Sequence, residues 1–341
     1  MKVWFDVLTP KQLIFFDRFS TYLKSKGVEC FMTSRVYPEV TTLARLHGID
    51  LIYCGKYGKT IPDKLKNSIK RMDKLFDIIQ AEKPDIAINS YSPDACRVAY
   101  GLAIPLFLLN DTPWAEITNR MTVPLAKRLW CPMVYQKHVF TKYGINESVI
   151  KRYDCIDAFV TAKRKSIGKP PIDEKYVLFR NPESFASYYN NSFDILSILK
   201  AVKKEIPYKI LVLCRYSEQF NMVKAMDDEQ IIPTIMKHDG KMLYENAEFF
   251  IGGGGTMSAE AALHGIPTII YDIIKKQQVV EFLEKKNLLL RVNDISQLRL
   301  KIKYIEENKS VFKLRAKDVN DHMHEPFELF YDDIRQVLGL E

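Results

Sequence analysis

The chain has 341 residues, of which 47% are hydrophobic and 27% are charged, and its formal net charge is +8. This length predicts two domains, and the composition is typical of a globular protein and excludes membrane-spanning helices, since no run approaches the ~20 apolar residues that cross a bilayer. The basic excess selects no partner by itself, and aromatic and basic residues do not alternate as they do in RNA-binding proteins, so we expect no nucleic-acid partner.

The first half of the chain alternates short apolar runs with amphipathic segments. Residues 1–8 predict a buried strand, and residues 12–26 predict a helix that ends before Gly27. Further strands are predicted at 29–33, 51–53, 86–90 and 106–111, with helices at 38–47, 63–81 and 93–101. Elements that alternate in this way form a parallel sheet with helices on both faces.

The helix predicted at residues 63–81 has an apolar and a basic face. Its apolar residues are Leu65, Ile69, Met72, Phe76 and Ile79. Its basic residues are Lys64, Lys66, Lys70, Arg71 and Lys74. We expect the apolar face to pack on the sheet and the basic face to be solvated. The alternative, which stays open, is a peripheral contact of the basic face with anionic lipid at the cytoplasmic side of a membrane.

The second half repeats the α/β pattern. Strands are predicted at 175–180, 208–214, 249–254 and 267–272, and residues 162–175 have the proline-rich, charged composition of a linker. We therefore predict a Rossmann-like domain over residues 1–165, a second one over residues 172–325, and a closing helix over residues 326–341. Because ligands bind where parallel strands end, the loops after Val7, Ile88 and Leu109 are expected to face a cleft between the domains.

The strongest chemical signal is a run of four glycines, Gly252 to Gly255, between a predicted strand and a predicted helix. Glycines let backbone N–H groups approach an anion, and a helix N-terminus adds unpaired donors. The predicted phosphate ligands are Gly253, Gly254, Gly255, Thr256, Met257 and Ser258. Glu260, one turn further, is placed to accept hydrogen bonds from ribose hydroxyls. The alternative is a tight turn in which Thr256 or Ser258 only caps the helix.

Residues 252–269 resemble the glycine turn, the helix with a ribose-binding glutamate and the Gly-x-Pro strand of the GT-B superfamily. This superfamily contains two-domain nucleotide-sugar glycosyltransferases and UDP-N-acetylglucosamine 2-epimerases, and the chain is similar to its largely archaeal DUF354 group. The resemblance implies two Rossmann-like domains that face each other across a cleft. It also implies that Gly254, Gly255, Thr256 and Ser258 contact the diphosphate and that Glu260 contacts the ribose.

Other segments extend this resemblance. Residues 106–132 resemble a strand that ends in an acid and is followed by a Glu-x-x-Asn-Arg helix, and residues 177–186 resemble a strand and loop that place Arg180 at the phosphates. Gln277 and Gln278 resemble the sugar-contacting glutamine of some glycosyltransferases.

The sequence departs from the epimerases at their acidic residues. Ser90 and Ser92 follow the fourth strand where the epimerases carry an acid, and Ile117 replaces the second glutamate of an acid pair. Residues 272–278 replace a Thr-Glu-Arg-Pro segment. Because epimerisation needs several positioned acid–base groups, these departures favour glycosyl transfer.

Two acids are the predicted catalytic groups. Asp111 ends a buried strand at the ligand edge and is the candidate base, with an N-cap of the following turn as the alternative. Glu116 is the remaining acid of the Asn-Arg helix, whose Asn119 and Arg120 are expected to orient Asp111 or Glu116. Four further residues have weaker predicted roles, with Lys11 and Arg215 near phosphate, Asp6 bonded to backbone and His264 a charge partner of its helix.

The expected function is metal-independent glycosyl transfer from a nucleotide-diphosphate sugar, with a UDP-sugar as donor, no cofactor, and a glycan or lipid-linked acceptor. Two alternatives stay open, a nucleotide-sugar 2-epimerase or hydrolase, and a non-catalytic nucleotide-sugar-binding protein. The six cysteines lack CxxC spacing, which predicts reduced, mostly buried thiols in a cytoplasmic protein and no zinc site.

Overall fold

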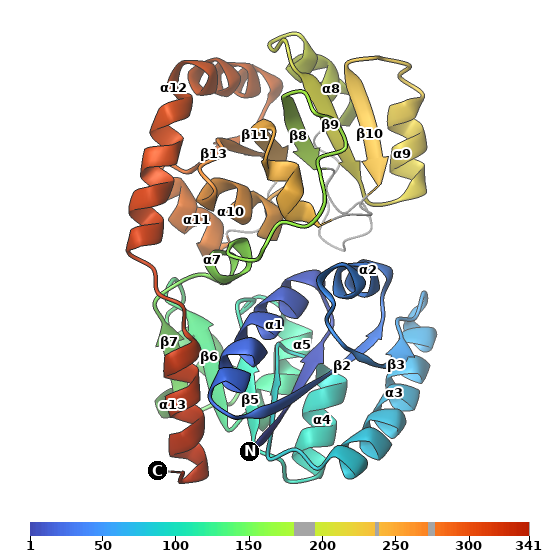
Figure 1. Cartoon of the computed structure of the whole chain (residues 1–341), viewed down its shortest axis with the longest axis vertical. Coiled ribbons are helices and arrows are strands. Elements are labelled where there is room, and N and C mark those ends of the chain that lie inside the picture. The colour runs from blue at the N-terminus through green and yellow to red at the C-terminus, as the bar shows by residue number, and fades with distance from the viewer. Residues whose placement is uncertain (181–194, 236–238, 272–276, 341) are drawn as a thin grey trace. The chain divides into compact units, whose positions relative to one another are not determined.

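The structure is a computed structural model that describes residues 1–180, 195–235, 239–271 and 277–340 (Figure 1). The described residues form two compact units. Unit 1 comprises Met1–Thr161 and His324–Glu341, and unit 2 comprises Ala162–Met323. The chain leaves unit 1 once and returns to it, so unit 2 is inserted within unit 1.

The described part of unit 1 contains a seven-stranded parallel sheet in the order β3-β2-β1-β4-β5-β6-β7. Its strands are β1 (Lys2–Val7), β2 (Glu29–Val36), β3 (Ile52–Lys56), β4 (Ile86–Asn89), β5 (Leu106–Leu109), β6 (Arg128–Pro132) and β7 (Ile150–Tyr153). Its helices are α1 (Pro10–Ser25), α2 (Pro38–His47), α3 (Ile61–Glu82), α4 (Pro93–Gly101), α5 (Glu116–Thr122), α6 (His138–Thr141), α7 (Asp157–Ala162, at the boundary) and α13 (Phe327–Leu338). Helix α1 contacts α2 and α13, while α4 contacts α3 and α5.

Helix α13 completes the core of unit 1 although it comes from the far end of the sequence. Phe330 stacks on Trp130 at a centroid distance of 4.2 Å, and Phe327 stacks on Phe19 at 5.3 Å. The buried carboxylate of Asp333 accepts a hydrogen bond from the Trp130 indole at 2.8 Å. Aromatic stacking and this buried hydrogen bond fasten the helix to the sheet.

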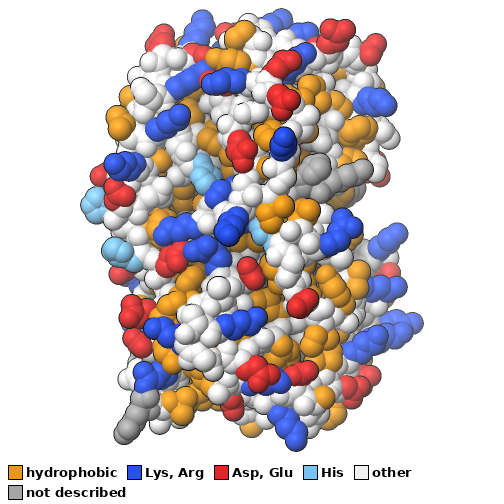
Figure 2. All heavy atoms as spheres, viewed as in Figure 1, with side chains coloured by type: hydrophobic (Ala, Val, Ile, Leu, Met, Phe, Trp, Pro, Cys, Tyr) orange, Lys and Arg blue, Asp and Glu red, His pale blue; other side chains and the backbone are white. Residues whose placement is uncertain are grey.

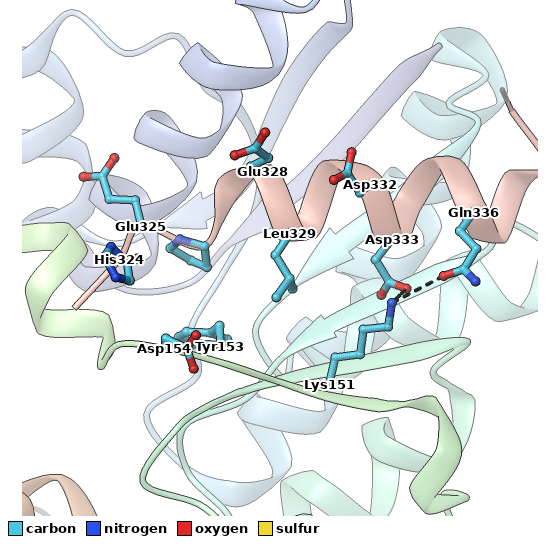
Figure 3. A pocket seen from close by; sticks show the side chains of 11 residues that line it. Lys151, Tyr153, Asp154, His324, Glu325, Glu328, Leu329, Asp332, Asp333 and Gln336 are labelled. Carbon is cyan, nitrogen blue, oxygen red and sulfur yellow. Dashed lines mark hydrogen bonds and ion pairs between the residues drawn. The ribbon is translucent and has the colours of Figure 1, made fainter. Parts of the chain in front are cut away.

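A polar groove between β7 and α13 is a consequence of this packing (Figure 3). Lys151 points from β7 to Asp333, with an Nζ to Oδ1 distance of 2.5 Å, and Arg128 approaches the same oxygen at 3.1 Å. Lys151 and Arg128 thus both form ion pairs with the buried carboxylate of Asp333. We interpret the groove as part of the helix–sheet contact rather than as a ligand site.

The described part of unit 2 contains a six-stranded parallel sheet in the order β10-β9-β8-β11-β12-β13. Its strands are β8 (Tyr176–Arg180), β9 (Lys209–Cys214), β10 (Ile231–Ile235), β11 (Ala247–Gly252), β12 (Thr268–Tyr271) and β13 (Leu289–Val292). Its helices are α8 (Ile195–Lys203), α9 (Ser217–Lys224), α10 (Thr256–Leu263), α11 (Gln278–Lys285) and α12 (Ile295–Asp321). The prediction of two doubly wound α/β domains is confirmed.

The units begin and end at residues other than those predicted. Residues 162–175 belong to unit 2 instead of forming a linker, because Arg164 is only 8% exposed and forms ion pairs within that unit. The closing helix belongs to unit 1. Local composition indicated a loop without showing that its single arginine is buried.

Strand order reverses once in each sheet, between β1 and β4 in unit 1 and between β8 and β11 in unit 2. Connections diverge to opposite faces at such a point and leave room beyond the carboxyl ends of the two central strands, where open α/β sheets bind ligands. Lys11 lies in the first turn of the helix that follows β1, while Arg180 and Gly252 end β8 and β11. The topology therefore positions two candidate sites.

The prediction for the faces of α3 was wrong at Arg71 and at part of the apolar face, although Lys64, Lys66, Lys70 and Lys74 are exposed as predicted. Arg71 was assigned to the solvated face but is 1% exposed, because it pairs with Asp6 at 2.5 Å and with Asp94 at 3.2 Å. Leu65 and Ile69, assigned to the packed face, are 64% and 56% exposed. The ion pair rotates the helix so that Arg71 faces the sheet, and part of the apolar face turns to solvent.

No disulfide joins the six cysteines, all of which lie in the described ranges, and five of them are buried. Burial raises the pKa of the Cys54 thiol to about 11, which keeps it protonated near neutral pH. Across the described residues, each helix is too short or too polar to span a bilayer.

Candidate functional site

The glycine turn joins β11 to α10. Gly254 and Gly255 have φ angles of 89° and 84°, a left-handed conformation that side chains oppose. A Cβ added to Gly255 would meet no atom within 4 Å, so space lies open beside the backbone. Gly253, Thr256 and Met257 are partly exposed around this space. The turn can therefore present its backbone to a ligand.

The first turn of α10 lacks a side-chain cap. Its N-cap is Gly255, and no side chain of the described residues makes a capping hydrogen bond there. The alternative interpretation, in which Thr256 or Ser258 caps the helix, is therefore wrong. Uncapped N–H groups at a helix N-terminus carry a partial positive charge and bind anions readily.

Ser258 adds a hydroxyl to this turn. The side chain is fully buried, and its Oγ has no hydrogen-bond partner among the described residues. A buried polar group without a partner costs about 1–3 kcal/mol. A ligand oxygen reaching the first turn of α10 would remove that cost.

Arg180 lies next to the glycine turn. It ends β8 and is paired in register with Gly252 on β11. A Cβ added to Gly252 would lie 2.7 Å from the Phe250 ring, so glycine is required there by the packing of that ring, and it would be in ordinary contact with the Cβ of Arg180 at 3.4 Å. Arg180 and the glycine turn therefore end neighbouring strands, at the point where the strand order of the sheet reverses.

Glu260 is engaged inside unit 2. It is 4% exposed, and its carboxylate accepts a hydrogen bond from Arg164 at 2.9 Å. Arg164 also donates to Asp239 at 2.9 Å, and the Tyr244 hydroxyl lies 3.4 Å from Glu260. Burial lowers the pKa of Arg164, but attraction to Glu260 and Asp239 outweighs it, so the guanidinium stays charged. The predicted ribose ligand therefore holds α10 to the segment after residue 161.

His264 is the C-cap of α10 and differs from its predicted role. Burial, with smaller effects of Lys241 and Arg164, lowers its pKa from 6.5 to about 4. The imidazole is therefore neutral near pH 7 and is not a charge partner of the helix.

Replacing His264 by glutamine is expected to make unit 2 less sensitive to acid. As pH falls from 6.5 to about 4, the unfolded chain protonates this histidine before the folded chain does. Acidification thus favours unfolding, by about 2 kcal/mol near pH 4.5. Calorimetric unfolding at neutral and acidic pH should show a smaller acid-induced loss for the variant. His322→Gln, at an exposed site, is the control and should lose as much stability on acidification as the wild type. If all three proteins lose the same stability, His264 does not have this role.

A second cluster lies at the strand reversal of unit 1. Lys11 Nζ is 2.5 Å from Asp111 Oδ2 and 3.0 Å from Asp157 Oδ2. The three side chains are 13%, 16% and 4% exposed, and Tyr153 donates a hydrogen bond to Asp157. One ammonium thus serves two carboxylates in a largely buried setting.

This arrangement shifts the pKa values of Lys11 and Asp111. Burial lowers the pKa of Lys11, but Asp111 and Asp157 outweigh burial and raise it well above its usual value. Burial and the Asp157 carboxylate raise the pKa of Asp111 against the opposing effect of Lys11. A carboxylate with a raised pKa is suited to acid–base catalysis near neutral pH. The Oδ1 atom of Asp111 is buried and has no hydrogen-bond partner in the described part of the chain.

The backbone around Asp111 is held by side chains from neighbouring elements. Tyr135 donates a hydrogen bond to the Asp111 carbonyl at 2.7 Å. Asn119 accepts from Asn110 at 2.8 Å and donates to the Thr112 carbonyl at 2.9 Å. Asn119 therefore fixes the loop that carries Asp111, as predicted.

Glu116, the second predicted catalytic acid, does not join the cluster. It pairs with Arg120 at 2.8 Å on α5, and the two side chains are 57% and 66% exposed. Hydrogen bonding to Arg120 lowers the pKa of Glu116. It is a surface ion pair, and such pairs have little effect on stability.

The remaining predicted ligands lie at the carboxyl edge of the sheet in unit 2. Gln277 is the N-cap of α11, and Gln278 is its first residue. Arg215 follows β9, and its backbone N–H donates to Gln219 at 2.9 Å. The loop predicted from residues 181–186 lies outside the described residues, as do positions 272–276. Within the described ranges, no three histidine, cysteine or acidic side chains are grouped to hold a metal ion.

Three residues of these clusters escaped sequence reasoning. Arg164 was placed in a linker, while Asp157 and Tyr91 carried no motif. Tyr91 has a φ of 50°, which is unfavourable for a side chain and is typical of strained residues at functional sites. Its pKa is raised mainly by burial, although Lys11 opposes the shift. The position of Tyr91 directly after the fourth strand was the available signal.

Comparison with known proteins agrees with this architecture. The sequence model of the family described as a protein of unknown function, DUF354, matches residues 1–336. An uncharacterized protein of Methanocaldococcus jannaschii is 28% identical over 339 residues, which cover 95% of this chain and 97% of that protein.

Solved structures share the fold. MnaA of S. aureus in complex with UDP has a TM-score of 0.77 and 16% identity, covering 100% of this chain and 97% of its own. The UDP-GlcNAc 2-epimerase of Neisseria meningitidis bound to UDP-GlcNAc gives 0.74 and 13%, covering 98% and 100%. The spinosyn rhamnosyltransferase SpnG complexed with thymidine diphosphate gives 0.64 and 12%, covering 97% and 99%. The predicted GT-B fold is thereby confirmed.

Proposed function

The chain belongs to the DUF354 family, and from its GT-B fold and the geometry of the glycine turn we propose that it is an enzyme that binds a nucleotide-diphosphate sugar in unit 2 and transfers the sugar. The observation that carries the proposal is the N-terminus of α10, where the Ser258 hydroxyl has no hydrogen-bond partner among the described residues and Arg180 lies on the adjacent strand. Together they supply hydrogen-bond donors and a positive charge, which are the groups that bind a diphosphate.

The binding step uses the donors of one turn. Backbone N–H groups of residues 255–258 and the Ser258 hydroxyl donate to the phosphate oxygens, and Arg180 neutralises their charge. As the bond to the sugar breaks, negative charge grows on the leaving diphosphate, so the same groups stabilise the transition state. The sugar contacts assigned to Gln277 and Gln278 belong to this proposal.

The transfer step needs a base for the acceptor hydroxyl. The acceptor oxygen bonds to the anomeric carbon, the bond from that carbon to the diphosphate oxygen breaks, and the hydroxyl proton moves to a carboxylate. We assign this carboxylate to Asp111, because its Oδ1 has no partner among the described residues and its pKa is raised. Lys11 and Asp157 hold the carboxylate in place.

The donor is proposed to be a UDP-sugar. The MnaA complex contains UDP, the Neisseria epimerase contains UDP-GlcNAc, and SpnG contains thymidine diphosphate. These ligands share a pyrimidine base and a diphosphate. No metal is needed for the leaving group if Arg180 and the α10 terminus supply the positive charge.

One observation favours epimerisation as a second candidate. Lys11, Asp111 and Asp157 form a richer acid–base cluster than the sequence indicated, and epimerisation depends on such groups. NMR of the reaction mixture separates the two reactions. An altered sugar on an intact diphosphate indicates epimerisation, whereas a glycosylated acceptor with released diphosphate indicates transfer.

Arg180→Gln is expected to weaken UDP binding by about ten- to a hundredfold, the loss that corresponds to one charge-assisted hydrogen bond of 1.5–3 kcal/mol. Isothermal titration calorimetry with UDP, thymidine diphosphate, GDP and CDP measures the change in affinity and shows which nucleobase the protein prefers. Lys175→Gln is the matched control, because Lys175 directly precedes the same strand and is 71% exposed. If none of the four nucleotides binds the wild type, the proposed function is wrong.

A further inference from the structure

Helix α3 leaves a row of large hydrophobic side chains in solvent. Ile61, Leu65, Ile69 and Phe76 are 82%, 64%, 56% and 48% exposed. Their spacing places them along one side of the helix, and we call these four residues the α3 stripe. Tyr100 on α4, the helix that contacts α3, is 59% exposed as well. Exposed hydrophobic residues that adjoin one another mark interaction surfaces.

The charges beside the α3 stripe change sign along the helix. Residues 61–72 contain one acid, Asp63, and three exposed lysines, namely Lys64, Lys66 and Lys70. Residues 73–82 contain one lysine, Lys74, and three acids, namely Asp73, Asp77 and Glu82. Figure 2 shows basic side chains gathered over part of α3. The first half of the helix is thus basic, and the second half is acidic.

We propose that the α3 stripe is the interface of a homodimer in which two α3 helices pair antiparallel about a twofold axis between Arg71 and Met72. A twofold axis makes the interface self-complementary, so each α3 stripe packs on the other. In this arrangement Phe76 lies beside Ile69 of the second copy, while Lys66 lies opposite Asp77 and Lys70 opposite Asp73. A parallel pair would place like charges together.

The same pattern disfavours an anionic lipid surface as the occupant. The α3 stripe runs through both halves of the helix, and Phe76 lies one residue from Asp77 and three from Asp73. Lipid phosphates would repel these acids at the second half of the stripe. A second copy supplies lysines at that place instead.

Sedimentation equilibrium of the full chain tests the proposal. We expect a dimer with about twice the 39.7 kDa mass of the chain at micromolar concentration. Leu65→Glu with Ile69→Glu should raise the dissociation constant at least a hundredfold, since it places four charges in the contact (~2.8 kcal/mol or more). Leu300→Glu is the matched control, because Leu300 is 67% exposed on α12 of unit 2, and it should leave the dimer unchanged.

Charge reversal tests the antiparallel direction. Lys66→Glu with Lys70→Glu should weaken the dimer about tenfold, and adding Asp73→Lys with Asp77→Lys should restore it. In a parallel pair the first change would merely replace one like-charge contact by another. Circular dichroism confirms that each variant is folded.

Three results would overturn the proposal. The first is a wild-type chain that remains monomeric across the micromolar range. The second is a dimer that Leu65→Glu with Ile69→Glu does not weaken. The third is a monomer that floats with phosphatidylglycerol vesicles and loses this binding in the same double variant, which would assign the α3 stripe to a lipid surface.

Discussion

Asp111→Asn is expected to lower the turnover of the nucleotide sugar by about 10²–10⁴-fold, the usual contribution of a general base. Asparagine keeps the shape of the side chain but cannot accept the acceptor's proton. Nucleotide affinity should change by less than about twofold, because the proposed phosphate ligands belong to unit 2 and only the catalytic step would lose a group. The loss should therefore appear in kcat.

Release of UDP or thymidine diphosphate from the nucleotide sugar measures this turnover. Glu116→Gln is the matched comparison, because Glu116 is the other predicted acid yet is 57% exposed, and it should retain wild-type kcat. Because the pKa of Asp111 is raised, the wild-type rate should increase as pH rises through that pKa, and Asp111→Asn should lose this limb of the profile. Wild-type turnover in Asp111→Asn would exclude it as the base.

Arg71→Met is expected to destabilise unit 1 by about 3–5 kcal/mol, the cost of breaking a buried ion pair by removing one partner. Arg71 is 1% exposed and donates to Asp6 at 2.5 Å, Asp94 at 3.2 Å and the Cys54 carbonyl at 3.2 Å. Methionine fills most of the volume but leaves the buried carboxylate of Asp6 without its cation. The change acts on stability and not on nucleotide binding.

Tryptophan fluorescence isolates this effect, because Trp4, Trp114 and Trp130 all belong to unit 1. Urea unfolding followed at the tryptophans should shift for Arg71→Met. Lys74→Met, three residues along the same helix and exposed, should change the unfolding free energy by less than about 0.5 kcal/mol. Equal midpoints for the two variants would show that the ion pair does not stabilise unit 1.

The alternation of strands and helices was sufficient to predict the central strands of both sheets and the glycine turn, because these patterns are local, whereas the edge strands β7, β10 and β13 were not predicted. Short apolar runs between amphipathic segments leave few topologies other than doubly wound sheets. Four consecutive glycines before a predicted helix likewise leave few interpretations other than a tight turn that exposes its backbone. Arg180 was placed by the resemblance of residues 177–186 to a GT-B strand and loop, and the structure pairs it in register with Gly252.

The clusters of charged residues could not be predicted, because their members are distant in sequence. Lys11 meets Asp111 and Asp157 across separations of 100 and 146 residues. Arg164 meets Glu260 across 96 residues, so Glu260, whose ribose contact stays a prediction, also has an ion-pair partner that the sequence did not indicate. Arg71 and Asp6, 65 residues apart, decide which side of α3 faces the sheet. Helical periodicity records only how hydrophobic residues are spaced, not which charge lies opposite.

The insertion of unit 2 between α7 and α13 reverses the order in which the units can mature during translation. Domains generally fold from the N-terminus as the ribosome releases them. Here unit 2 is complete once Met323 has emerged, whereas unit 1 still lacks Phe327 and Phe330, the rings that stack on Phe19 and Trp130. Unit 1 is therefore synthesised first but completed last, because Phe19 and Trp130 lack their stacking partners until α13 has been made.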